Sequence, residues 1–229
     1  MFRFIRHTID RFVIQDTSFK FLYDRDETGE VVSLDCETTG FDPWIDDVIS
    51  VAAIKIKDNR ILTHQSFNAL VKPEAEMRPE AMKVHRLLQR DVASAKPMAE
   101  VLPDLLRFIG SRPIMGYWID FDMSMLDKYV LHHLGVRLPN ERVEVSKLYY
   151  DRKYGDAPQG TQLDLRFDVI RKDLKLPPIN QHDAHEDALL AAKMYVILKD
   201  MKARGVRIPR TAGIGGVSTG AAPPPVHGF

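Results

Sequence analysis

The sequence has little cysteine, no excess of charge of either sign, and no long run of apolar residues. Its one cysteine, Cys36, excludes an internal disulfide and fits a reducing compartment. Lys and Arg together number 32, as do Asp and Glu, so the formal net charge is zero. No overall field therefore attracts a polyanion to the protein. We expect any contact with nucleic acid to be local and aided by bound metal.

The sequence also has no feature of a membrane protein. No apolar run is long enough to span a bilayer. Three arginines, Arg3, Arg6 and Arg11, interrupt the apolar residues at the N-terminus, unlike the apolar core of a secretory signal. We therefore expect a soluble, cytoplasmic protein without membrane contact.

What is present fits one sizeable domain with an appendage at each end. The chain has 229 residues, of which 45% are hydrophobic, and no internal repeat. Residues 1–30 form an N-terminal extension whose helical spacing of apolar residues predicts an amphipathic helix. We expect this helix to pack on the domain's own surface, and docking to a membrane or to a partner is the less favoured alternative. Residues 31–205 form the domain, and residues 206–229 are a Gly, Ala and Pro-rich tail that we expect to be disordered.

The periodicity of apolar residues predicts an α/β fold. Strands are expected at 31–36, 48–56 and 61–71, the last two forming a hairpin. After residue 71, segments whose apolar residues have helical spacing alternate with a short buried strand. The remaining expected elements are a short helix opened by Pro79, a helix ending at Gly110, a strand over 113–117, and helices over 121–134, 163–174 and 184–204. Residues 143–150 fit either a strand or a helix. Three strands in a meander followed by alternating helices and strands predict a sheet with helices packed against it.

The stretch Val-Val-Ser-Leu-Asp-Cys-Glu-Thr-Thr-Gly, residues 31–40, combines a strand with two acidic side chains. Because side chains alternate along a strand, Asp35 and Glu37 should share one face while Leu34 and Cys36 point into the opposite layer. Two adjacent carboxylates repel unless a cation lies between them, and hard oxygen ligands suit Mg²⁺ or Mn²⁺. A solvated strand end is the simpler interpretation of an isolated Asp-x-Glu, so the rest of the chain decides.

Two more aspartates each lie in the first turn of a predicted helix. Asp122 opens the helix over 121–134, and Asp187 opens the last helix. The exposed N–H groups of a first turn favour an aspartate, and this alone is a sufficient explanation for either residue. Asp120, two residues before Asp122, is a second candidate ligand.

Leu-Asp-Cys-Glu-Thr-Thr-Gly, Phe-Asp-x-x-x-Leu and His-x-x-x-x-Asp-Ala, in this order, resemble the three exonuclease motifs of the DEDDh family. This ribonuclease-H-like group includes the proofreading epsilon subunits of bacterial DNA polymerase III, ribonuclease T and oligoribonuclease. The resemblance covers about residues 31–200. It implies a mixed sheet, with a three-stranded antiparallel meander plus parallel strands, flanked by helices. It also implies a 3′–5′ exonuclease that hydrolyses phosphodiester bonds at the 3′ end of single-stranded or frayed nucleic acid and releases nucleoside 5′-monophosphates.

The resemblance also implies roles for particular residues. Four carboxylates would hold two Mg²⁺ or Mn²⁺ ions: Asp35, Glu37, Asp122 and Asp187. His182, five residues before Asp187, takes the position of the general base, and a histidine is suited to accept a proton near neutral pH. Thr38 lies in the turn where the family contacts the terminal nucleotide. His85 lies where the family places a histidine near the substrate pocket, and a role as a partly buried, hydrogen-bonding residue is an equal alternative for it.

His185 offers an alternative interpretation of the third motif. With His182 and Asp187 it would make a zinc cluster, which the lack of a nearby cysteine disfavours. It would also be the substitute base if the motif were read in another register, although the spacing favours His182.

The substrate and the partner are less closely determined by the sequence. Tyr117 and Trp118 replace the His-Asn pair that commonly precedes the Phe-Asp motif; we expect them to pack into the core, and stacking on a base is the alternative. DNA is the favoured substrate, but an RNA-trimming or short-oligoribonucleotide exonuclease and a non-catalytic nucleic-acid-binding module stay open. The resemblance makes a DNA polymerase a candidate partner, and a homodimer is also open.

Overall fold

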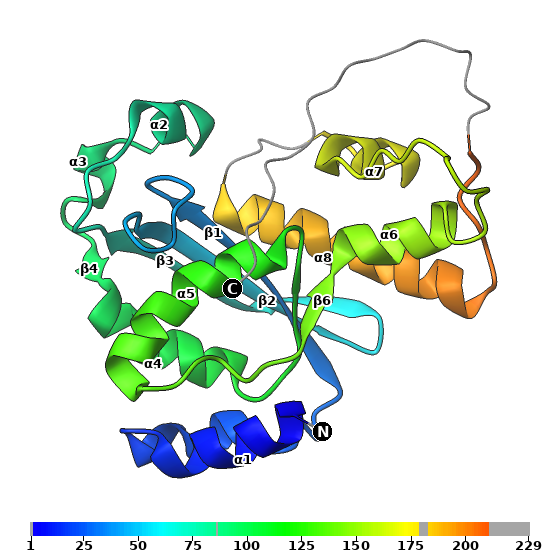
Figure 1. Cartoon of the computed structure of the whole chain (residues 1–229). Coiled ribbons are helices and arrows are strands. Elements are labelled where there is room, and N and C mark those ends of the chain that lie inside the picture. Colours follow the sequence, from blue (N-terminus) through cyan, green and yellow to red (C-terminus); the bar gives the residue numbers. More distant parts are fainter. Residues whose placement is uncertain (1, 86, 179–182, 211–229) are drawn as a thin grey trace.

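The computed structural model describes residues 2–85, 87–178 and 183–210 of the chain (Figure 1). The strands are β1 (Glu30–Thr38), β2 (Val48–Lys57), β3 (Arg60–Lys72), β4 (Lys96–Pro97), β5 (Ile114–Gly116) and β6 (Arg142–Glu144). The α-helices are α1 (Phe2–Val13), α2 (Pro79–His85), α3 (Gln89–Val92), α4 (Met98–Ile109), α5 (Ile119–Leu134), α6 (Val145–Lys153), α7 (Phe167–Asp173) and α8 (Ala184–Ala203), and η1 (Thr17–Tyr23) is a 3₁₀ helix.

The strands form one mixed sheet in the order β4-β3-β2-β1-β5-β6. β1, β2 and β3 are an antiparallel meander, as predicted, and β5 and β6 run parallel to β1 on its other side. A Cβ added to Gly116 would lie 2.8 Å from the carbonyl oxygen of Leu34, so only glycine lets β5 approach β1 this closely. The meander and the parallel strands therefore meet at β1, the strand with the acidic pair.

Helices cover both faces of this sheet (Figure 1). On one face Val32, Leu34 and Cys36 of β1 join a core that includes residues of α4 and α5. On the other face Ser33 donates a hydrogen bond of 2.7 Å to the carbonyl oxygen of Ala188 on α8. Asp35 follows Ser33 by two residues, so β1 directs its acidic side chains toward the α8 side.

Two predicted helix starts moved for local reasons, and the structure resolves one ambiguous segment. The helix expected over 163–174 begins only at Phe167, because the Asp164 carboxylate accepts a hydrogen bond from the Arg166 backbone N–H and holds a turn there. The ambiguous segment 143–150 ends β6 and then becomes α6. α5 starts two residues earlier than expected because the Glu144 carboxylate accepts a hydrogen bond from the Ile119 backbone N–H.

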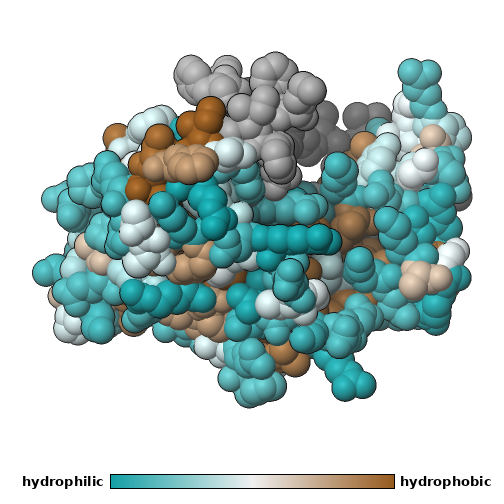
Figure 2. All heavy atoms as spheres, turned by 90° about the horizontal axis from the view of Figure 1, so that it is seen from below, coloured by the Kyte–Doolittle hydropathy of each residue, from teal (hydrophilic) through white to brown (hydrophobic). Residues whose placement is uncertain are grey.

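The N-terminal helix forms as expected, but its apolar face is not fully covered. Ile9, Phe12 and Val13 of α1 are exposed, with Phe12 77% accessible, so the expectation that this stripe packs on the domain was wrong for these residues. In Figure 2, seen from the side of the molecule where α1 lies, hydrophobic side chains gather at the upper left and again right of the centre of a mostly hydrophilic face.

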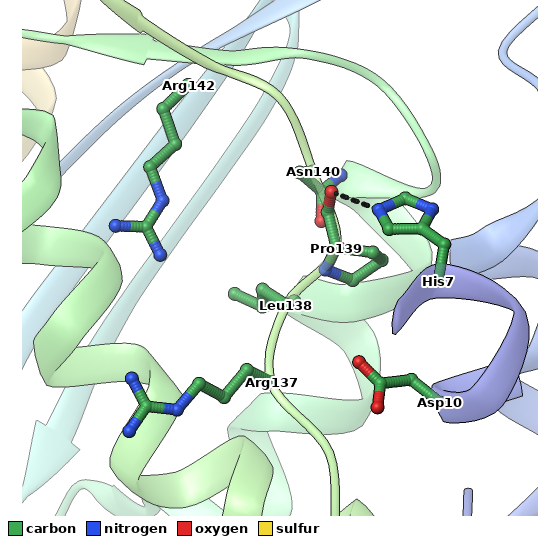
Figure 3. Close-up of a pocket in the computed structure, with 7 residues that line it drawn as sticks. All are labelled: His7, Asp10, Arg137, Leu138, Pro139, Asn140 and Arg142. Atoms are coloured by element: carbon green, nitrogen blue, oxygen red, sulfur yellow. Dashed lines mark hydrogen bonds between the residues drawn. The ribbon is translucent and has the colours of Figure 1, made fainter. Parts of the chain in front are cut away.

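Among the described side chains of α1, His7 contacts the domain through a polar atom. His7 Nε2 lies 3.0 Å from the carbonyl oxygen of Pro139, in the segment between α5 and β6 (Figure 3). A pocket of about 360 Å³ lies at this contact, and none of the predicted site residues lines it. No helix in the described part of the chain combines the length and the apolar character needed to cross a bilayer.

Candidate metal centre

The acidic residues of β1 lie next to the first turn of α8. Carboxylate oxygens of Asp35, Glu37 and Asp187 all lie within 4.8 Å of one another. Glu37 is 8% exposed, and the other two side chains are partly buried. Strand alternation brings the first two to one face, and the packing of α8 on β1 brings the third from about 150 residues away.

α8 is started by a residue that the sequence analysis did not single out. The Asp183 carboxylate accepts hydrogen bonds from the backbone N–H groups of His185 and Glu186, at 3.0 and 3.1 Å. This N-cap fixes the start of α8 and with it the position of Asp187 in the first turn. The sequence does contain a pattern that identifies Asp183 as the N-cap, because Asp-Ala-His-Glu is a capping box, which marks the start of a helix.

Asp122 reaches the same strand from the other side of the sheet. Its side chain is buried, and Oδ1 accepts a hydrogen bond of 2.9 Å from the backbone N–H of Cys36, between Asp35 and Glu37. Asp120, the other candidate in this turn, has a side chain that is 81% exposed and pairs with Arg142 at 2.9 Å. The structure therefore brings Asp122 to the acidic cluster and leaves Asp120 outside it.

Burial and mutual repulsion raise the pKa values of these carboxyl groups. Burial raises the pKa of Asp35 well above its ordinary value, and the charges of Asp122 and Asp187 raise it further. Burial, then the charges of Asp187 and Asp183, raise the pKa of Glu37 to about 8. Burial also raises the pKa of Asp122, although the Cys36 N–H bond opposes this effect. Buried like charges of this kind are relieved by cations, and an all-oxygen donor set fits Mg²⁺ or Mn²⁺.

The remaining predicted site residues are placed as follows. The Thr38 hydroxyl donates a hydrogen bond of 2.7 Å to the carbonyl oxygen of Gly40, so it closes the turn after β1. His85 is the last residue of α2, and its side chain and all of His182 lie outside the described residues. His185 Nδ1 lies 2.9 Å from Asn68 Oδ1 on β3. Among the described residues, no histidine belongs to the group that can hold a metal, so the zinc cluster gains no support.

A polar network holds the loop after β1 against α5. One carboxylate oxygen of Asp47 accepts hydrogen bonds from Lys128 Nζ at 2.6 Å and from the Tyr129 hydroxyl at 2.8 Å. Its other oxygen accepts the backbone N–H groups of Glu74 and Ala75, at 2.9 and 2.7 Å. No local sequence pattern predicts this network, because the partners of Asp47 are 27 to 82 residues away in the chain.

The two aromatic residues before α5 differ in burial: Tyr117 packs into the protein and Trp118 lies at the surface. Tyr117 is partly buried, packs against Phe167 with ring centroids 5.0 Å apart, and donates a hydrogen bond to the carbonyl oxygen of Leu165. Trp118 is 50% exposed. The expectation that both rings pack into the core was therefore wrong for Trp118, because the chain turns outward there to begin α5.

A family model, RNase_T, described as an exonuclease, matches residues 32–195. The chain is 28% identical over 180 residues to a DNA polymerase III PolC-type from Thermotoga petrophila, which covers 76% of this chain and 12% of that protein. It is 28% identical over 174 residues to a DNA polymerase III subunit epsilon from Aquifex aeolicus, which covers 76% of this chain and 82% of that subunit. The chain thus spans about 12% of the length of the PolC-type relative.

Solved structures agree on the fold. An Escherichia coli exonuclease I–single-stranded DNA complex in its zinc-bound form superposes with a TM-score of 0.64 at 17% identity, over 78% of this chain and 42% of that one. Exonuclease X in complex with 5′ overhanging duplex DNA gives a TM-score of 0.56 at 20% identity, over 78% of this chain and 95% of that one. The expected ribonuclease-H-like mixed sheet is therefore confirmed.

Proposed function

The chain belongs to the RNase_T exonuclease family, with motifs of the DEDDh type, and from that premise we propose that it is a metal-dependent 3′–5′ exonuclease. Its proposed substrate is a single-stranded or frayed 3′ end, with DNA favoured, and its products are nucleoside 5′-monophosphates. The observation that carries the proposal is the convergence of Asp35, Glu37 and Asp187 within 4.8 Å, with Asp122 bonded to the strand between the first two. We propose that residues 31–205 form this catalytic domain.

The four carboxylates are the residues that would hold two divalent cations, Mg²⁺ or Mn²⁺. Cations held there would supply positive charge against the phosphoryl oxygens and the departing 3′ oxygen. We propose that His182 accepts the proton of the attacking water, because it lies five residues before Asp187 in the third motif. Thr38 and His85 are proposed contacts of the terminal nucleotide. A DNA polymerase is the proposed partner, on the basis of the PolC-type and epsilon relatives.

Matched DNA and RNA oligonucleotides test this proposal. With Mg²⁺ or Mn²⁺, we expect single-stranded DNA labelled at its 5′ end to shorten stepwise from the 3′ end, more slowly in blunt duplex, and not at all in EDTA. Chromatography of the products should give nucleoside 5′-monophosphates. Digestion of RNA without digestion of DNA would replace the DNA assignment with an RNA-trimming one. If the protein digested none of these substrates, a non-catalytic nucleic-acid-binding module would be the remaining interpretation.

His182→Ala tests the assignment of the base. Because His182 is proposed to move a proton and not to bind metal, we expect kcat to fall about 10²- to 10⁴-fold, with the affinity for Mg²⁺ kept. His185→Ala is the matched control, since its ring contacts Asn68 on β3, and its kcat should stay within about threefold of the parent. A His182→Ala protein as fast as the parent would remove the base assignment, and a large loss in His185→Ala alone would shift it to His185.

A further inference from the structure

Trp118 lies where β5 passes into α5, with its ring half exposed and its backbone in a left-handed conformation. We propose that this ring is a stacking platform for a nucleobase of the single-stranded substrate. The inference rests on the proposed function and adds to it a residue that binds the strand outside the metal centre.

The position of Trp118 is set by the strands beside the acidic cluster. β5 runs parallel to β1, with Ser33 opposite Met115, so β5 ends at Gly116 beside Leu34, the residue before Asp35. Trp118 then precedes Asp122 by four residues. Trp118 is the N-cap of α5 and Asp122 lies in its first turn, so about one helical turn, roughly 5 Å along the axis, separates them. The indole is therefore attached within a helical turn of a carboxylate of the metal centre.

The backbone at Trp118 has a conformation that bulky residues rarely adopt. Its φ is 59° and its ψ is 31°, a region that glycine and asparagine tolerate much better than an aromatic residue does. The Trp118 side chain makes no capping hydrogen bond, because an indole has a donor and no acceptor. The Glu144 carboxylate, at the end of β6, accepts the Ile119 N–H at 3.1 Å in its place. Helix α5 thus does not need a capping side chain at this position. The backbone of Trp118 is strained, and helix α5 does not require this residue as a cap. The strain therefore indicates that the Trp118 ring has another role.

The indole ring lies next to an aromatic ring that is itself fixed. It lies parallel to the Tyr117 ring, with an angle of 6° between the planes and centroids 6.4 Å apart. Tyr117 is itself fixed by its hydrogen bond of 3.1 Å to Leu165 and by its contact with Phe167. Half of the Trp118 surface stays accessible. A ring supported in this way can receive a base with little loss of side-chain freedom.

The charge of the chain gives a second reason to expect stacking. The formal net charge is zero, so the protein has no general attraction for a polyanion. Affinity for a strand must then come from local contacts. Aromatic stacking provides such a contact without preference for one base, because every base has a π face.

Steady-state kinetics on a dT oligonucleotide separate this role from a structural one. We expect Trp118→Asn to raise KM about 5- to 100-fold while kcat stays within about threefold, because the lost contact binds ground state and transition state alike. Asparagine suits the left-handed backbone, so the melting temperature should not fall. Trp118→Phe should recover most of the affinity. Phe12→Ala, which removes an exposed ring from α1, should leave KM unchanged. An unchanged KM in Trp118→Asn would overturn the inference.

Fluorescence gives a direct measurement, because the chain has only two tryptophans. In Trp44→Phe, Trp118 is the only indole, and we expect its emission to be quenched when a phosphorothioate dT oligonucleotide binds in Mg²⁺. Binding seen by anisotropy without quenching would contradict the stacking platform and leave the proposed exonuclease standing. Failure of the parent protein both to bind and to digest any oligonucleotide would overturn the exonuclease and the platform together.

Discussion

Asp35→Asn is expected to reduce exonuclease turnover at least about 10³-fold while the protein stays folded. Asp35 is one of three residues whose carboxylate oxygens lie within 4.8 Å of one another, and burial and the charges of Asp122 and Asp187 raise its pKa. Asparagine keeps the volume and one oxygen but removes the charge that would hold a divalent cation, so stabilisation of the reacting phosphoryl group is lost. The measurement is kcat/KM for 3′-end digestion of single-stranded DNA, with circular dichroism as the check on folding.

Asp120→Asn is the matched control for this loss. Asp120 has the same side chain and lies in the first turn of α5, but its carboxylate is exposed and pairs with Arg142. We expect its kcat/KM to stay within about threefold of the parent. Equal losses in Asp35→Asn and Asp120→Asn would mean that activity follows surface charge and not the buried cluster.

Removing divalent metal is expected to make the protein less stable as the pH rises. The folded pKa of Glu37 is about 8, above its ordinary value of 4.5, so the folded state binds this proton more tightly than the unfolded state. Its contribution to stability is complete below about pH 4.5 and is lost as the pH rises to about 8. The raised pKa values of Asp35 and Asp122 act in the same direction. In EDTA, the melting temperature should therefore fall between about pH 5 and pH 8.

The size of this fall can be estimated from the proton affinities. A tenfold change in proton affinity corresponds to about 1.4 kcal/mol, so the loss in free energy of unfolding is a few kcal/mol, or on the order of 5–10 °C in melting temperature. Mg²⁺ should raise the melting temperature most at about pH 8, where the carboxylates are charged. Glu37→Gln should flatten the pH dependence in EDTA. A melting temperature that rises over this pH range in EDTA would show that the cluster is not strained by its own charge.

The sequence alone predicted the elements whose structure follows from a local pattern of residues. The meander followed from apolar alternation, and α5 and α8 followed from helical spacing. Placement of Asp35 and Glu37 on one face followed from the two-residue period of a strand. The proximity of Asp187 did not follow from any local pattern. It came from the resemblance of three separated motifs to one family, which the match to an exonuclease model over residues 32–195 supports.

The sequence alone did not predict the features that depend on contacts between residues far apart in the chain. The polar network around Asp47 depends on residues of α5, and no local sequence pattern links Asp47 to them. Trp118 was expected in the core because it is aromatic and follows a buried strand, but α5 begins at the next residue and Trp118 is half exposed. The apolar stripe of α1 gave no information on whether the domain has a surface to cover it, and Phe12 is exposed.

The central claim is that carboxylates from β1, α5 and α8 together hold divalent cations. Calorimetric titration of the metal-free protein with Mn²⁺ at about pH 8 tests this claim most directly. We predict saturable binding of two ions per chain in the parent and in Asp120→Asn, and loss of at least one of them in Asp35→Asn. Unchanged binding of Mn²⁺ in Asp35→Asn, or no binding in the parent, would contradict it.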